Sequence, residues 1–412
     1  MTTYRTASSW MPAAAAVFTA GWGANQFAPL AVVYRTERHW RDIPVAAMFT
    51  TYLFGLLPGL LLGGPASDQR GRRIVRPALA LSAVASALLS LAPVSQFPVY
   101  ASRLAAGVAA GVVLSAGTTW IVELSADLGR PSAGPRRAMN ATGGGLAAGA
   151  LVAGILAQWS PWPAVFPALV HTVLALLCLA ATWKVPETAP SPVTVAKVRH
   201  VRGVGRSATR HPRFLRVVLP ASPAVFAAAT VAYVVLPPLL ADRVPGYAPL
   251  FSGLVTALTL ATGIAVQPLA RLLDHAGNAR ATLAGMATVI AGLLLGSYAV
   301  YQGSVVLTSV AALLLGAGYG LTSASGLREL ERLTPPSALP STVSLYHGTT
   351  YLGFLTPLFL AVTAGAAPYP ALLAGMAAAG LLFLSITAWH SRSHLPHRIS
   401  GELKERKEQW AE

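Results

Sequence analysis

Long stretches without a charged residue recur along the chain and indicate its fold. A transmembrane helix needs about 20 apolar residues, so each stretch can be counted in spans. The first is too long for the hydrophobic core of a cleaved secretory signal, and we interpret it as a retained span. Four stretches fit one span or slightly more: residues 6–34, 43–67, 217–241 and 244–270.

The remaining stretches are each long enough for two spans. Residues 74–122 contain only Arg76 and Arg103 as charges, and a turn-like PVSQFP segment divides them. Three further stretches also have a turn near their middle, and they cover residues 138–183, 281–327 and 333–391. The pattern therefore predicts an all-α membrane protein with twelve transmembrane helices.

Composition agrees with this pattern. Hydrophobic residues make up 54% of the 412 residues and charged residues 11%, with a mean hydropathy of +0.57, whereas soluble domains carry roughly a quarter charged residues. The single cysteine, Cys178, excludes an intrachain disulfide and a cysteine metal cluster. No P-loop and no GxSxG nucleophile elbow is present, so we expect neither an enzyme nor a cofactor.

The net charge of +16 could suggest nucleic acid as a partner, but the basic residues lie next to the predicted spans. With a cytoplasmic N-terminus, 25 of the 30 basic residues fall on the cytoplasmic side, as the positive-inside rule requires. We therefore expect a monomeric protein of the cytoplasmic membrane with both termini inside, membrane lipids as partners, and no nucleic acid. The exceptions are Arg103 in a span and Arg35, Arg38, Arg41 and Arg243 outside.

An offset of 206 residues superposes the two halves of the chain. It maps Asp68 on Asp274, Gly71 on Gly277 and Glu123 on Glu329, although the chain has only fourteen acidic residues. We predict two six-helix halves, a cytoplasmic linker lying on the anionic leaflet and a cytoplasmic tail. Their bounds are 1–183 and 217–391 for the halves, 184–216 for the linker and 392–412 for the tail.

The segment GGPASDQRGRR joins the second and third predicted spans. Gly64 allows close helix approach, Gly71 can adopt a positive φ, and Asp68 can cap a helix or pair with arginines. The pattern resembles the signature G-x-x-x-D-x-x-G-R-R of the major facilitator superfamily, which Arg72 and Arg73 complete. The second copy keeps Asp274 and Gly277 but has Ala270, Asn278 and Ala279 at the other positions.

The resemblance implies that this loop is a latch that stabilises the outward-facing state, with Asp68 at its centre. A purely topological role, a positive-inside turn, is the alternative. The resemblance also implies a gate of salt bridges at the cytoplasmic ends of spans four and ten. The gate would consist of Glu123 with Arg136 and Arg137, and of Glu329 with Arg328 and Arg332.

Two further segments are similar to patterns of the same superfamily. In RLAAGVAAG, Arg103 precedes two glycines, and in proton-coupled members such an arginine is linked to substrate binding or proton transfer. Snorkelling to the headgroups is the alternative for Arg103. Span five resembles the antiporter signature G-x-x-x-G-P-x-x-G-G, although small-residue helix packing would need the same glycines. Gly145, Gly149 and Gly154 match the signature, and Ala150 and Ala153 depart from it.

No Asp or Glu lies deep in a predicted span, so a proton carrier must be sought elsewhere. His347 titrates in the right range, and Glu123 or Glu329 could serve from the gate. His171 is a weaker candidate, because the resemblance places span six at the periphery. The candidate substrate and proton path, from helices that line it in the superfamily, is Asn25, Gln26, Arg103, Trp120, Tyr233, Tyr346 and His347.

These residues would form an aromatic pocket with one positive charge, suited to an amphipathic or anionic organic solute. We therefore expect a secondary active transporter that works by alternating access, most like the drug/proton antiporter-type exporters, moving a small organic solute out in exchange for protons. A solute importer, by symport or facilitated diffusion, and a non-transporting receptor or scaffold are the alternatives.

Overall fold

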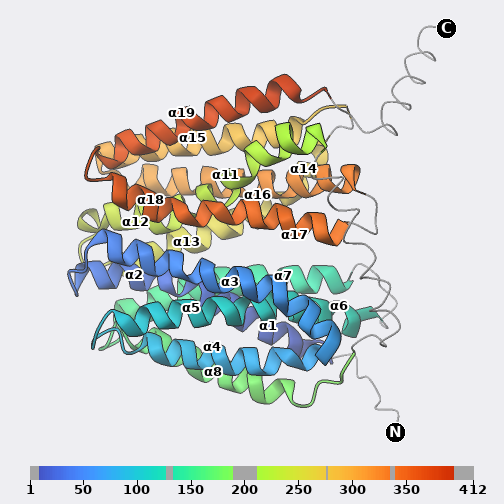
Figure 1. Ribbon diagram of the computed structural model, residues 1–412. Coiled ribbons are helices and arrows are strands. Elements are labelled where there is room, and N and C mark those ends of the chain that lie inside the picture. The colour runs from blue at the N-terminus through green and yellow to red at the C-terminus, as the bar shows by residue number, and fades with distance from the viewer. Residues whose placement is uncertain (1–8, 127–132, 189–210, 275–276, 335–338, 394–412) are drawn as a thin grey trace, which may run out of the picture. The chain divides into compact units, whose positions relative to one another are not determined.

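The computed structural model describes residues 9–126, 133–188, 211–274, 277–334 and 339–393. These residues form α-helices joined by short 3₁₀ and π segments (Figure 1). Helices that follow one another without a loop combine into twelve spans, which confirms the predicted all-α membrane fold.

The first six spans are built from ten helical segments. The segments, grouped by span, are α1 (Met11–Asn25) with α2 (Phe27–Thr36); α3 (Asp42–Arg70); η1 (Arg72–Ile74) with α4 (Val75–Leu89); α5 (Phe97–Val112), η2 (Val113–Gly117) and α6 (Thr118–Ser125); α7 (Ala133–Trp159); and α8 (Phe166–Thr182).

The last six spans contain more breaks. Grouped in the same way, they are η5 (Phe214–Val218), α11 (Leu219–Thr230), η6 (Val231–Val235) and α12 (Leu236–Leu239), followed by the short η7 (Ala241–Arg243); α13 (Ala248–Ala265) with α14 (Gln267–Leu273); α15 (Arg280–Gln302); α16 (Val305–Leu333); α17 (Leu339–Thr350), η8 (Tyr351–Leu355) and α18 (Thr356–Thr363); and α19 (Tyr369–His390).

Eight of the described spans are long and apolar enough to cross a membrane by length and composition. The other four are shorter or broken: α1 stops before Gln26, α4 and α8 have 15 and 17 residues, and η8 interrupts the eleventh span. Breaks inside a membrane helix need local polar partners for the freed backbone groups. They are therefore places to look for function.

The chain divides into two compact units. The first contains residues 1–196 and 233–260, and the second contains residues 197–232 and 261–412. The end of the seventh span (233–239) and the first half of the eighth (248–260) thus group with the first six spans. In each unit the helices lie side by side with nearly parallel axes (Figure 1).

Glycines allow the closest helix contacts in the first unit. A Cβ at Gly55 of α3 would collide with the Leu104 carbonyl of α5, and a Cβ at Gly107 with the Tyr52 carbonyl. Gly59 and Gly111 repeat the arrangement one turn further along. The glycines that follow Arg103 in the sequence are therefore the surface on which α3 and α5 pack, as small-residue interfaces do in membranes.

Candidate functional site

Arg103 is buried in the first unit, with only 1% of its surface exposed. Its guanidinium carbon is 4.5 Å from the ring centres of both Phe27 and Tyr52. Its one hydrogen bond is long, 3.4 Å from Nη1 to the Ala24 carbonyl oxygen. Nε and Nη2 have no hydrogen-bond partner in the part of the chain that the structure describes. The two rings therefore hold a buried cation whose hydrogen-bonding capacity is largely unused.

Aromatic side chains from three spans surround this cation. Tyr34 from α2, Tyr52 from α3 and Tyr233 from η6 all lie within its electrostatic reach. Tyr233 also packs edge-on against Phe49, with 6.2 Å between the ring centres. The structure thus brings together Arg103 and Tyr233 from the predicted path.

Two path residues at the break in the first span point in different directions. Asn25 Nδ2 donates to the Leu146 carbonyl oxygen of α7 at 3.3 Å. Gln26 Nε2 donates to Ser86 Oγ of α4 at 3.0 Å. The side chain of Gln26 therefore faces α4, and only its backbone adjoins Phe27 beside the cation.

The three other path residues have surroundings of their own. Trp120 packs in a core cluster with Val17 and Leu124, and its indole N–H donates to the Pro186 carbonyl oxygen at 3.1 Å. Tyr346 and His347 belong to the second unit. The Tyr346 hydroxyl donates weakly, at 3.4 Å, to carbonyl oxygens of α16, and His347 packs against the rings of Tyr346 and Tyr351.

The signature loop is a network of ion pairs centred on Arg72. Arg72 donates twice to the Glu123 carboxylate, at 3.0 and 2.7 Å, and once to Asp68 at 2.7 Å. Burial lowers the pKa of this guanidinium, but the hydrogen bonds and charges of Glu123 and Asp68 outweigh burial and the pKa is raised. Gly71 ends α3 with φ +91°, which explains a glycine there.

The beginning of the predicted linker binds this same network. Glu187 accepts hydrogen bonds from the backbone N–H groups of Arg72 and Arg73, at 2.7 and 3.2 Å. Thr188 Oγ1 donates to Glu123 at 2.6 Å. Residues 186–188, which we call the linker strap, therefore fasten the linker to the loop. Sequence reasoning missed Glu187, because its spacing from the loop carries no local pattern.

The other predicted gate and latch residues of the first half have separate contacts. Arg137 donates to Ser125 Oγ at 3.1 Å and stacks over the Trp10 ring. Arg136 is exposed, as is Arg73, which lies 3.8 Å from Glu187. A Cβ at Gly64 would meet no atom within 4 Å among the described residues. The gate role of Arg136 and Arg137 stays a prediction.

The second copy uses different cations for the same acids. Asp274 binds Arg328 and Arg332, each at 2.7 Å, and Gly277 follows it in a turn. Glu329 binds Arg213 twice, at 2.7 and 2.9 Å, with Arg332 further off at 3.4 Å.

Arg213 is the partner that sequence reasoning missed in this copy. The equivalent of Arg72 is Asn278, so the repeat itself offers no cation at that place. Arg213 comes from the end of the linker instead. It is 1% exposed and also donates to the carbonyl oxygens of Ser391 and Ser393.

The glycines of the antiporter-like pattern are contact points of α7. A Cβ at Gly145 or Gly149 would collide with the backbone of Phe18 or Trp22 in α1. A Cβ at Gly154 would lie 2.9 Å from the Pro249 carbonyl oxygen of α13. These glycines therefore serve close helix packing, and their match to the antiporter signature stays a resemblance.

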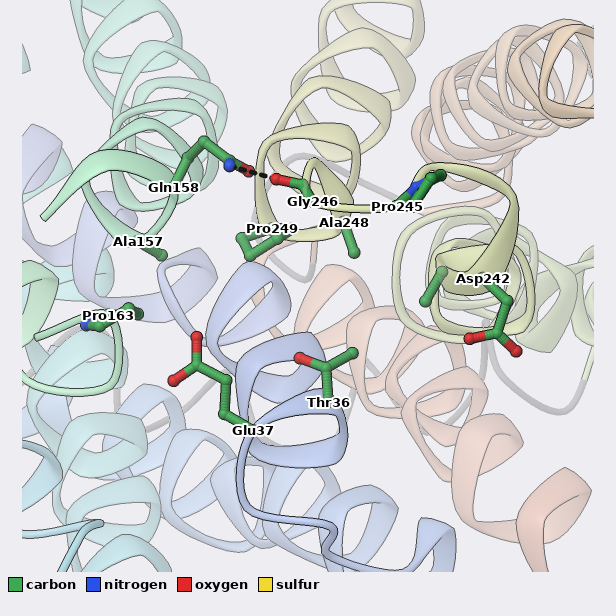
Figure 2. Close-up of a pocket in the computed structure, with 11 residues that line it drawn as sticks. Thr36, Glu37, Ala157, Gln158, Pro163, Asp242, Pro245, Gly246, Ala248 and Pro249 are labelled. Atoms are coloured by element: carbon green, nitrogen blue, oxygen red, sulfur yellow. Dashed lines mark hydrogen bonds between the residues drawn. The ribbon is translucent and has the colours of Figure 1, made fainter.

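A cavity of about 490 Å³ lies at the ends of α2 and α7 and is lined by none of the predicted residues. Figure 2 shows Thr36 and Glu37 on one side of it and Gln158, whose amide donates to the Gly246 carbonyl oxygen, on another. Asp242 adds a second carboxylate to its wall. Burial raises the pKa of Glu37, while nearby Arg38 lowers it in part.

Known proteins share the fold described above. The family described as Major Facilitator Superfamily matches residues 13–353. No curated protein sequence matches the chain. Among solved structures, a POT family transporter in complex with 5-aminolevulinic acid has a TM-score of 0.75 at 11% identity, and covers 94% of this chain and 96% of its own.

Two more solved structures are similar over most of both chains. The nucleoside transporter NupG has a TM-score of 0.72 at 13% identity, with coverage of 92% and 98%. A D-xylose-proton symporter has a TM-score of 0.68 at 15% identity, with coverage of 94% and 98%. At such identities the likeness concerns the fold. The family match covers most of the chain, and it confirms that the protein is a transporter and not an enzyme. The chain belongs to the major facilitator superfamily and is a multi-pass secondary transporter of small solutes.

Proposed function

We propose that this transporter exports a small organic anion in exchange for protons, and that Arg103 binds the anionic group. The observation that carries the proposal is the buried guanidinium with two nitrogens that have no partner in the described residues. An arginine within a span costs about 2.5–3.5 kcal/mol on insertion scales. A carboxylate would use the free edge of the guanidinium in a bidentate pair.

The surroundings of Arg103 favour an amphipathic anion. Phe27 and Tyr52 cover its faces, and Tyr34 and Tyr233 add ring surface with hydroxyl groups. Arg103 is enclosed in this structure, so a solute reaches it only when the helices around it move apart. That requirement suits alternating access, in which a site opens to one side at a time.

The remaining parts of the proposal concern direction and topology. Export is supported by the resemblance of span five to the antiporter signature, and orientation by the placement of the basic residues. The Asp68 loop acts as the latch and the acids Glu123 and Glu329 as gate residues. The protein works as a monomer in the cytoplasmic membrane, with both termini inside and the sequence halves 1–183 and 217–391 as its moving parts.

The test uses purified protein and pairs of ligands. A panel of aromatic and amphipathic carboxylates, each with its neutral methyl ester, is screened by thermal shift. We expect acids to stabilise the parent and their esters not to. Arg103→Gln should weaken binding of the best acid about tenfold to hundredfold, because a charge-assisted pair is lost. Arg76→Gln is the matched control, since Arg76 instead binds carbonyls at the end of α8.

Flux of the same acid then decides direction. In inverted vesicles with an acidic interior, export by antiport appears as uptake that a protonophore abolishes. Uptake of the acid into right-side-out vesicles would instead indicate import by symport. It would overturn the proposed export but would leave Arg103 as the anion-binding residue. Equal binding of acid and ester, or unchanged binding in Arg103→Gln, would overturn the anion site.

A further inference from the structure

A buried chain of hydrogen bonds joins the first, third and sixth spans. Gln26 Nε2 donates to Ser86 Oγ at 3.0 Å, Ser86 Oγ lies 2.6 Å from His171 Nδ1, and His171 Nε2 lies 2.9 Å from the Thr19 carbonyl oxygen. His171 has no exposed surface, and the other three residues are at most 3% exposed. Gly23 provides the space, because a Cβ there would lie 2.8 Å from the imidazole.

The partners determine the direction of each bond. The Thr19 carbonyl can only accept, so Nε2 of His171 carries hydrogen. Ser86 already accepts from Gln26, and its hydroxyl donates to Nδ1. With this direction of the Ser86 bond His171 is neutral, and this is the form that we assign to the conformation. At the other end of the chain, Gln26 Oε1 is buried without a hydrogen-bond partner among the described residues.

No charged side chain faces the imidazole from the helices packed against it. In α1 there is no titratable residue, and in α8 the other one is Cys178, bonded to Thr19. In α4 the sole charge is Arg76, which binds the far end of α8. In α7 the charges are Arg136, which is exposed, and Arg137, bonded to Ser125. The hydrogen bonds of His171, and not neighbouring charges, therefore determine its protonation state.

Both Arg103 and the hydrogen-bond chain from His171 contact the break in the first span between α1 and α2. Arg103 contacts the Ala24 carbonyl oxygen and the Phe27 ring, on either side of the break. The chain from His171 holds Gln26, which is the residue between α1 and α2. An anion at Arg103 and a proton at His171 would therefore act on the same short segment.

We propose that His171 is the proton-binding residue of this transporter, and that Ser86 and Gln26 transmit its protonation to the break in the first span. A proton from water adds to the lone pair of Nδ1, which then donates to Ser86 Oγ. The Ser86 hydroxyl must turn to another acceptor, and Gln26 Oε1 becomes that acceptor when the amide turns. This step deepens the proposed proton exchange and rests on it.

The test is a pH titration that needs no solute. The full chain, with ¹³C- and ¹⁵N-labelled histidine, is placed in lipid nanodiscs, and imidazole signals are followed by NMR from pH 3 to 8.5. The His171 signal is the one lost in His171→Gln. His347→Gln is the matched control and should leave that signal in place. We expect His171 to pass from the Nε2–H tautomer to the imidazolium while the protein stays folded.

Two variants should move the titration midpoint in opposite directions, each by about half to one pH unit. Ser86→Ala removes the donor that favours neutral His171, so the midpoint should rise. Gln26→Leu removes the acceptor that the protonated state needs, so the midpoint should fall. If Ser86→Ala does not fold, Ser86→Thr with Gln26→Leu still tests the acceptor, since threonine keeps the hydroxyl.

A folded protein in which His171 stays neutral over the whole range would overturn the proposal, as would midpoints that both variants leave unchanged. The outcome is separate from that of the transport test. Proton-coupled flux without titration of His171 would mean that another residue binds the proton. Titration without flux of any panel acid would retain the proton site and remove the anion proposal.

Discussion

Each acid of the repeated loops has an arginine partner, but the two halves supply those partners differently. In the first half, Arg72 lies within the loop and binds both Asp68 and Glu123. In the second half, Asp274 takes arginines from α16, and Glu329 takes Arg213 from the end of the linker. The acids are thus repeated while their cations are not, since any nearby arginine can pair with a carboxylate at these positions.

The linker strap gives a prediction at this scale. Its anchor is Glu187, which accepts two backbone hydrogen bonds from the loop. A hydrogen bond to a charged group contributes about 1.5–3 kcal/mol. Glu187→Ala should therefore release the strap and increase its open population at least about tenfold.

Val185 provides the measurement, because it is 4% exposed beside the strap. In a chain with Cys178→Ser and Val185→Cys as its single cysteine, maleimide labelling should be slow in the parent and at least tenfold faster with Glu187→Ala. The exposed Glu331→Ala in α16 should leave the rate unchanged. Equal rates with and without Glu187 would show that the strap is not held by this carboxylate.

At the scale of helices, glycine pairs determine which spans approach most closely. Gly55 and Gly59 of α3 face Gly107 and Gly111 of α5, whereas Gly64 of α3 faces open space within 4 Å. Helix association in lipid depends on this close packing, because the lipid tails are as apolar as the helix surface. The same helix therefore contains one glycine at which an added methyl group would collide and one at which it would not.

Gly55→Ala should destabilise the protein, and Gly64→Ala should not. The added methyl group at position 55 collides with the Leu104 carbonyl, and overpacking of this kind costs about 1–3 kcal/mol. The melting temperature in detergent checks the difference, since both variants make the same change in the same helix. Equal melting temperatures would mean that α3 and α5 adjust at little cost.

The spans themselves could be predicted from charge-free stretches, because crossing the hydrocarbon core sets a minimum apolar length. The break at Gln26 also has a signal in the sequence, which the charge-free stretches do not show: Pro29 has no backbone N–H to donate to the Asn25 carbonyl four residues earlier. The orientation of Gln26 toward Ser86 could not be predicted, because every face of a membrane helix is apolar and periodicity does not identify its partners. The peripheral role expected for His171 from the resemblance likewise gave no sign of its buried hydrogen-bond chain.

The direct partners of Glu123 at the gate could not be identified fully from the sequence, for the same physical reason. The sequence placed Arg136 and Arg137 near Glu123, and the structure adds Arg72 and Thr188 as direct partners. The two predicted neighbours are close in sequence, but the observed ones come from another loop and from the linker. Such pairs depend on how helices pack, which a single sequence does not contain.

At the scale of the whole molecule, charge distribution predicts which side of the membrane each end of the bundle faces. The loop that contains Asp68 and Arg72 lies at the same ends of the spans as Ala126, after α6, whereas Thr36 ends α2 on the opposite side. Since the predicted topology assigns 25 of the 30 basic residues to the first side, the positive-inside bias predicts that this side faces the cytoplasm.

Single cysteines at two exposed positions test this orientation. In the Cys178→Ser chain, which keeps a hydroxyl for the bond to Thr19, Thr36→Cys should react with a membrane-impermeant maleimide in intact cells. Ala126→Cys should react only after permeabilisation, and both should then label to the same extent. The expected difference is large because short basic loops are retained on the cytoplasmic side during insertion. The reverse labelling pattern would invert the topology, and with it the direction of export, while leaving the ion pairs within each unit unaffected.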